Sequence, residues 1–225
     1  MTNQLNQLKK DLALLINPEK AAFFPRFFKT GKGQYGEGDQ FLGVTVPDQR
    51  TVAKKYKQLT LAELKELLNS PIHEHRLVAI LILVHQFEKG DETSRKKIYE
   101  FYLKHKARVN NWDLVDSSAH KIVGPYLEDK PREILFELAE SESLWDRRIA
   151  MMSCFYFIRN NDFDDALRVA EMLVDDRHDL IHKAVGWMIR EIGARDEGPA
   201  LDFLRRHQDM PRTMWRYATE KGLGI

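Results

Sequence analysis

Apolar residues recur at intervals of three and four along most of the chain, and strand-like alternation of apolar and polar residues is nearly absent. Such intervals keep apolar side chains on one face of an α-helix. Prolines punctuate the pattern where new helices would start, as a first helical turn tolerates them. They are Pro18, Pro47, Pro71, Pro131 and Pro211. The pattern predicts an all-α fold with about eleven helices.

Capping residues mark several of these helix starts. Thr60 and Glu63 form a capping-box pattern ahead of the run LKELL, in which each side chain binds a backbone N–H of the other residue. Asp91, Ser143 and Asp196 are further candidate N-caps, because short oxygen-bearing side chains accept hydrogen bonds from the first helical turn.

The segment GKGQYGEGDQFLG, residues 31–43, differs from the rest because it holds five of the twelve glycines. It predicts a long loop, and long loops are often functional. It has neither the preceding strand nor the GK[ST] ending of a phosphate-binding loop. We interpret it as a connector between the N-terminal helices and the main body, with a backbone contact to phosphate as the alternative.

The helices repeat at a regular distance. Four apolar helices align at Arg76, Asp113, Arg148 and Lys183, in steps of 37, 35 and 35 residues, with amphipathic helices between them. Two-helix units of this period resemble HEAT-type repeats. Such units stack into a curved solenoid, here expected to be right-handed, whose concave face is lined by the inner helices. We expect one domain over residues 1–225, with N-terminal helices and glycine-rich loop over 1–46 and repeats over 47–225.

Composition narrows the class of protein. The 225 residues are 43% hydrophobic and 31% charged, which is typical of a soluble globular chain. Cys154 is the single cysteine, so an intrachain disulfide and a cysteine-rich zinc site are excluded. The eight histidines include no HExxH motif. His73 and His75 are interpreted as capping, core or surface groups, and we expect neither a metal nor a small-molecule cofactor.

Location follows from the apolar runs. The N-terminus lacks a continuous apolar signal-peptide core, and the apolar run from Leu77 to Val84 is too short to span a bilayer. We therefore expect a cytoplasmic protein of bacterial type with no membrane partner.

The net charge of +1 does not by itself indicate a nucleic-acid partner, so a polyanion would need positive charge gathered on one face. Residues 95–108 carry six lysines and arginines against one acid, and residues 203–225 carry five against two. Each run is typical of a solvated helix face, and each would also suit the flank of a duplex.

Candidate chemistry lies on the inner helices. Trp112 and Asp116 are four residues apart and share one helix face. A second inner helix carries Lys183, Trp187 and Arg190 at spacings of four and three. Arg148 begins a third. Each residue alone is typical of a core tryptophan or a surface charge, and only their combination at repeat spacing favours a functional surface.

Two neighbours compete for these roles. Asp113 is an alternative to Asp116, or a first-turn charge favoured by the helix dipole. Arg147 is likewise an alternative to its neighbour Arg148.

Three stretches resemble the HEAT-like DNA alkylation repair glycosylases, the AlkD-like family. They are NNWDLVD (110–116), LWDRRIA (144–150) and KAVGWMIRE (183–191). The resemblance covers the chain from about Pro18 onward. It implies excision of N3- and N7-alkylated purines from duplex DNA as free bases, while the damaged base stays stacked instead of being flipped into a pocket.

Matching residue by residue, the resemblance implies a site on the inner helices. Asp116 takes the position of the catalytic aspartate, Trp112 and Trp187 those of the indoles at the deoxyribose, and Arg148 that of an arginine holding the lesion. DNA contacts are implied for Arg190, Lys183 and Phe27. Phe27 stands where some members carry tyrosine, so one hydroxyl contact is missing.

This chemistry suits a single carboxylate. A cationic alkylpurine is already a good leaving group and needs no general acid, while the sugar gains positive charge that a carboxylate stabilises. We therefore expect a monomeric, monofunctional glycosylase whose partner is duplex DNA containing alkylated purines. A non-catalytic solenoid that binds damaged or unusual DNA and a protein-interaction scaffold are the alternatives.

Overall fold

The computed structural model describes residues 3–220 of the chain; Lys221, counted in the C-terminal basic run, lies outside them. The described residues form thirteen α-helices and one 3₁₀ helix, with no strand beyond an isolated bridge between Gln40 and Ile72. The predicted all-helical fold is confirmed. None of the described helices combines the length and the apolar character that crossing a bilayer would need.

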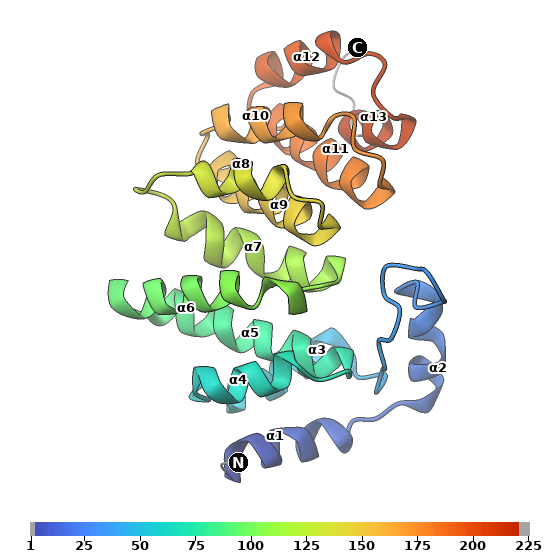
Figure 1. The fold of residues 1–225 in the computed structure, drawn as a ribbon, viewed down its shortest axis with the longest axis vertical. Coiled ribbons are helices and arrows are strands. Elements are labelled where there is room, and N and C mark those ends of the chain that lie inside the picture. The colour runs from blue at the N-terminus through green and yellow to red at the C-terminus, as the bar shows by residue number, and fades with distance from the viewer. Residues whose placement is uncertain (1–2, 221–225) are drawn as a thin grey trace. The chain divides into compact units, whose positions relative to one another are not determined.

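The chain divides into two compact units, Met1–Ser118 and Ala119–Ile225, and the boundary lies within α7 (Trp112–Tyr126). In the first unit α5 is the central helix, buried along most of its length and packed against α3, α4 and α6 (Figure 1). Its other elements are α1 (Asn3–Ala13), α2 (Pro18–Phe27), α3 (Val46–Lys55), α4 (Leu61–Leu68), α5 (His73–Lys89), α6 (Glu92–Lys104) and the 3₁₀ helix η1 (Lys106–Arg108).

The second unit repeats the pairing of an apolar helix with an amphipathic one. The apolar α9 packs against α8, α10 and α11, and α11 packs against α12 and α13. Gly186 lets α13 approach α11, since a Cβ there would lie 2.4 Å from the carbonyl oxygen of Met214. The elements are α8 (Glu133–Ala139), α9 (Leu144–Arg159), α10 (Asp164–Leu173), α11 (Asp179–Gly193), α12 (Glu197–Arg206) and α13 (Arg212–Thr219).

The predicted caps are present. Thr60 and Glu63 form the capping box, with the Glu63 carboxylate accepting the Thr60 backbone N–H at 2.8 Å. Asp91, Ser143 and Asp196 each accept a backbone N–H from the helix that follows. These caps satisfy N–H groups that have no partner within the helix, which is why the sequence marks the boundaries so well.

The glycine-rich segment is anchored to the start of α5. The buried Glu74 carboxylate accepts the backbone N–H groups of Leu42, Gly43 and Val44 at 2.8–3.3 Å. Gly43 has a φ of +79°, and a Cβ there would lie 2.2 Å from the carbonyl oxygen of Asn17. These three N–H groups therefore already hold an internal carboxylate, which disfavours a phosphate cradle at this end of the loop.

Candidate functional site

Trp112 and Asp116 lie one turn apart at the start of α7, and both side chains are partly exposed. Two backbone N–H groups of this first turn are satisfied by neighbouring side chains. The Asn111 amide oxygen accepts the N–H of Trp112, and the Asp113 carboxylate accepts that of Leu114, both at 2.8 Å. The start of the helix is therefore well defined, as a site on it requires.

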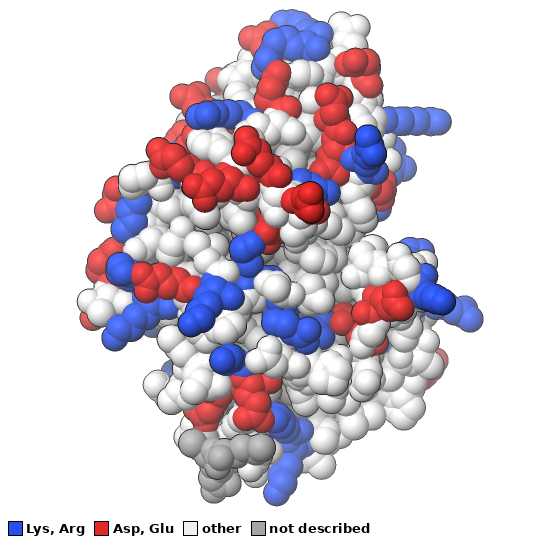
Figure 2. Space-filling model, in the orientation of Figure 1, with Lys and Arg blue, Asp and Glu red and all other residues white. Residues whose placement is uncertain are grey.

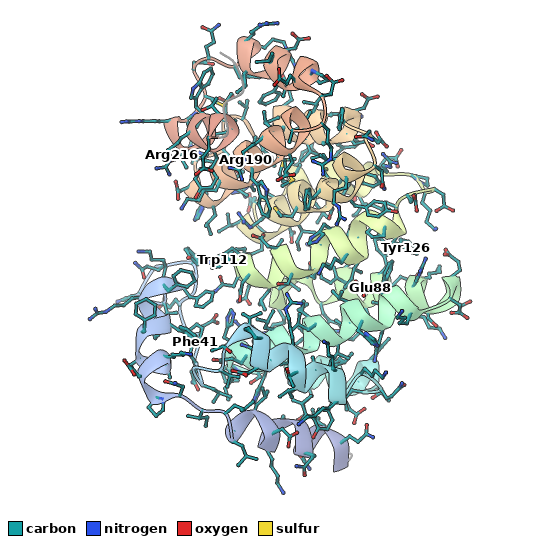
Figure 3. All side chains as sticks on the ribbon, turned by 180° about the vertical axis from the view of Figure 1, so that it is seen from behind. Phe41, Glu88, Trp112, Tyr126, Arg190 and Arg216 are labelled. Atoms are coloured by element: carbon teal, nitrogen blue, oxygen red, sulfur yellow. The ribbon has the colours of Figure 1, made fainter. Side chains whose placement is uncertain are left out.

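Aromatic rings from the N-terminal region hold the Trp112 indole. The Phe28 ring stacks on the indole, with centroids 5.5 Å apart and planes at 19°, and Phe41 stacks on Phe28 in turn. Phe27 contacts the indole edge-on at 5.6 Å and is 52% exposed. Figure 3 shows Trp112 at the first turn of α7, on the side of α2. Sequence reasoning found Phe27 but missed Phe28 and Phe41.

Asp113 is committed to the structure of this region. One of its oxygens accepts the Leu114 N–H and the other lies 2.7 Å from Nε2 of His73. A carboxylate in the first turn also interacts favourably with the helix dipole. The other aspartate that the sequence offers, Asp116, lies three residues further along α7 and is partly exposed.

His73 lies between two carboxylates and is only 2% exposed. Its Nδ1 is 3.0 Å from Asp39, which also pairs with Arg76 at 2.7 Å. Burial by itself would lower the pKa of His73, but the charge and hydrogen bond of Asp113 and the hydrogen bond of Asp39 raise it to about 9. The imidazole is therefore charged at neutral pH.

The Asp39 carboxyl stays ionised in the same cluster. Burial would raise its pKa, but the hydrogen bond from His73 and the charge of Arg76 hold the pKa below its ordinary value. No sequence pattern indicates this cluster, because Asp39 lies in the glycine-rich loop and His73 by itself is typical of a capping, core or surface group.

In the second unit, Arg148 is 4% exposed and donates a hydrogen bond to the carbonyl oxygen of Leu180 on α11. Direct contact with DNA would require that side chain to leave Leu180. Its neighbour Arg147 pairs with Asp176 at 2.6 Å. The Trp187 indole is partly exposed, contacts Phe155 of α9 at 5.7 Å and donates its N–H to Glu191.

The remaining predicted cations of α11 are paired. Lys183 forms an ion pair with Asp179 one turn earlier, at 2.7 Å. Arg190 donates to the carbonyl oxygen of Tyr217 at 3.1 Å and pairs with Glu220, joining α11 to α13 (Figure 3). Partly exposed pairs of this kind contribute about 0–1 kcal/mol, so a phosphate group can compete with the carboxylates.

Charge on the surface limits where a polyanion would bind the second unit. Figure 2 shows acidic side chains gathered over α8 and α10. The acidic residues of these two helices are Glu133, Glu137, Asp164, Asp165 and Glu171. A polyanion would meet these acidic side chains there, although Asp165 is paired with Arg132 and Glu171 with Arg206.

Several cations of the two basic runs have partners within the chain. In the first, Lys96 pairs with Glu100, and Arg108 donates to the carbonyl oxygens of Leu68 and Ser70. In the second, Arg205 pairs with Asp202 and Arg206 with Glu171. Within residues 3–220, no three His, Cys, Asp or Glu side chains are grouped so as to hold a metal ion.

The structure thus brings the predicted residues together in two sets. Trp112 and Phe27 are in contact in the first unit, with Asp116 one turn along α7. Arg148, Lys183, Trp187 and Arg190 lie on the adjacent helices α9 and α11 of the second unit.

Comparisons with known proteins concern the family and the fold of the chain. A family model described as "DNA alkylation repair enzyme" matches residues 8–221. A solved structure described as a predicted DNA alkylation repair enzyme from Enterococcus faecalis superimposes with a TM-score of 0.71 at 16% identity, covering 92% of this chain and 96% of that chain.

A second solved structure, AlkD2 from Streptococcus mutans, gives a TM-score of 0.56 at 17% identity and covers 97% of each chain. At these identities the likeness concerns the fold alone. A search of curated proteins found no match.

Proposed function

Since the chain belongs to the DNA alkylation repair enzyme family, whose model spans residues 8–221, we propose that it is a monofunctional DNA glycosylase. It hydrolyses the N-glycosidic bond of positively charged N3- and N7-alkylated purines in duplex DNA and leaves the damaged base in the stack. The products are the free base and an abasic site, and the reaction needs no cofactor.

Asp116 is the proposed catalytic residue. As the bond to the base breaks, the purine leaves as a neutral molecule and positive charge develops on the deoxyribose. A carboxylate 4 Å from that charge stabilises it by about 4 kcal/mol at an effective dielectric constant of 20. This corresponds to roughly a thousandfold in rate. The same carboxylate positions the water that adds to the sugar carbon.

The observation that carries the proposal is the aromatic stack of Phe28 and Phe41 beside Trp112, one turn before Asp116 on α7. Asp113 has its two carboxylate oxygens engaged, by Leu114 and His73, and Asp116 is the other aspartate of the motif, with a partly exposed side chain. Trp112, one turn before Asp116, is held by stacking on Phe28. An indole face attracts a cation by about 0.5–2 kcal/mol.

The second unit carries the other residues that the family resemblance implies. There Trp187 contacts a deoxyribose, and Arg148 contacts DNA once its side chain has left the carbonyl oxygen of Leu180. Lys183 and Arg190 bind backbone phosphates in exchange for their present carboxylate partners. Recognition is of the backbone and the damage, so binding should weaken steeply as salt rises.

A base-release assay on methylated duplex DNA tests the proposal. We expect the wild type to release 7-methylguanine and 3-methyladenine. Asp116→Asn should lower the rate on the order of a thousandfold while leaving DNA binding in place. Asp164→Asn, which alters an exposed aspartate of α10, is the matched control and should keep the wild-type rate.

Two outcomes would contradict the proposal. Release by Asp116→Asn at the wild-type rate would exclude the mechanism. No release by the wild type, together with tight salt-sensitive DNA binding, would select the non-catalytic DNA-binding alternative.

A further inference from the structure

His73 stands where three segments of the first unit meet. Asp39 comes from the glycine-rich segment, His73 and Arg76 from the first turn of α5, and Asp113 from the first turn of α7. Two cations and two carboxylates balance in charge. Of the nearby ionisable groups, Glu74 is engaged with loop N–H groups and Arg108 with main-chain carbonyl oxygens.

The imidazole also belongs to the aromatic stack. Its ring lies 4.7 Å from Phe28 and 5.0 Å from Phe41, centroid to centroid. Phe28 stacks on Trp112. His73 is therefore linked to the start of α7 by two sets of contacts. It contacts the Asp113 carboxylate directly, and it contacts Phe28, which stacks on the Trp112 indole.

The two hydrogen bonds of the His73 imidazole to carboxylates require the ring to be positively charged. A charged imidazole has two N–H donors, whereas a neutral one has a single donor and a lone pair on the other nitrogen. The shortest contact of each nitrogen is a carboxylate, Asp113 at 2.7 Å and Asp39 at 3.0 Å, while the Arg76 guanidinium lies 3.4 Å from Nδ1. Loss of the proton would therefore set a lone pair against one of the two carboxylates. The pKa of about 9 agrees with this geometry. Because His73 is buried with both nitrogens engaged, it has no access to a substrate proton.

We propose that His73 is a positioning residue, which joins the glycine-rich segment to the first turn of α7 and so fixes the orientation of Trp112 and Asp116. This inference rests on the proposed base-release reaction for its effect on rate. The proposal also assigns a structural role to the glycine-rich segment, because Asp39 of that segment contacts one nitrogen of His73. The loop acts through α7 and need not touch DNA.

The test compares His73→Gln with His75→Gln. Glutamine at position 73 can still form a hydrogen bond but carries no charge. His75 lies two residues along the same helix and is buried as well, but its Nδ1 faces Ser70 at 3.0 Å. We expect His73→Gln to lower single-turnover base release on the order of ten- to hundredfold. The Kd for DNA and the rate of His75→Gln should each change less than about twofold.

A second readout does not depend on activity. The protein is labelled with 5-fluorotryptophan, and Trp112→Phe identifies the Trp112 resonance among the four tryptophans. In the wild type we expect this ¹⁹F resonance to titrate with a midpoint near pH 9. In His73→Gln it should be displaced and no longer titrate, whereas in His75→Gln it should match the wild type.

The outcomes separate this inference from the proposed function. Wild-type rates in His73→Gln, or a Trp112 resonance that neither titrates nor differs in that variant, would overturn the positioning role. If the wild type releases no base, the proposed function fails and the Trp112 resonance still decides the inference. If His73→Gln does not fold, the wild-type titration decides it.

Discussion

Raising the pH from 6.5 to 9 should destabilise the protein, because the His73 imidazole, which holds Asp39 with one nitrogen and Asp113 with the other, loses its charge. The pKa of His73 is raised from 6.5 to about 9 in the folded chain. A group with a raised folded-state pKa contributes its full stability below its unfolded pKa and loses it as the pH rises through the folded value. The affected range is therefore pH 6.5 to 9.

The size of the effect follows from the shift. One pKa unit corresponds to about 1.4 kcal/mol, so a rise from 6.5 to about 9 makes about 3 kcal/mol of the unfolding free energy depend on this proton. For a chain of this length, about 3 kcal/mol corresponds to a Tm lower by about 10 °C. The total stability of such a chain is about 5–15 kcal/mol, so the loss is large enough to measure.

Other buried groups change the stability of the protein in different pH ranges. Burial, with a smaller effect of Lys9, lowers the pKa of His75 to about 4, so its contribution to stability rises with pH between about 4 and 6.5. Burial raises the pKa of the Cys154 thiol above its ordinary value of 9.0, so Cys154 lowers stability only above that pH. Between pH 6.5 and 9, His73 dominates.

The assay is urea unfolding at half-unit pH steps from 6 to 9, for the wild type and His73→Gln. The wild type should be more stable at pH 6.5, and the difference between the two proteins should shrink by about 3 kcal/mol by pH 9. A difference that stays constant across this range would contradict this prediction, because it would show that the His73 imidazole binds its proton no more tightly in the folded chain than in the unfolded chain.

Two further predictions concern the N-terminal region. Gly43→Ala should lower the free energy of unfolding in urea by at least about 2 kcal/mol, because the new side chain would have a φ of +79° and a Cβ 2.2 Å from a carbonyl oxygen. Gly33→Ala should lower it by only about 1 kcal/mol, because Gly33 has a φ of +75° but open space around it. Equal losses in the two variants would contradict the close approach. Phe27→Tyr should tighten binding of alkylated duplex about two- to tenfold through one added hydrogen bond, with the Tm nearly unchanged because the ring is 52% exposed. An unchanged Kd in a fluorescence-anisotropy titration would show that this ring does not face DNA.

Sequence reasoning succeeded where structure is local. Helix boundaries followed from capping residues such as Thr60 and Asp91, whose side-chain oxygens accept N–H groups within the next three residues. The pairing of Trp112 with Asp116 on one face required only the helical period. The predicted helix number was low by two, since the described residues hold thirteen α-helices.

The order of residues along the chain is therefore enough to predict the helices, their repeat and the motifs of the family. The neighbours of those motifs are set by packing. Asp39 and Asp113 lie 34 and 40 residues from His73, yet all three meet in one buried cluster. A helical period depends only on residues close together in the sequence. The ion pairs of a buried charge depend on which distant segments pack around it and exclude water.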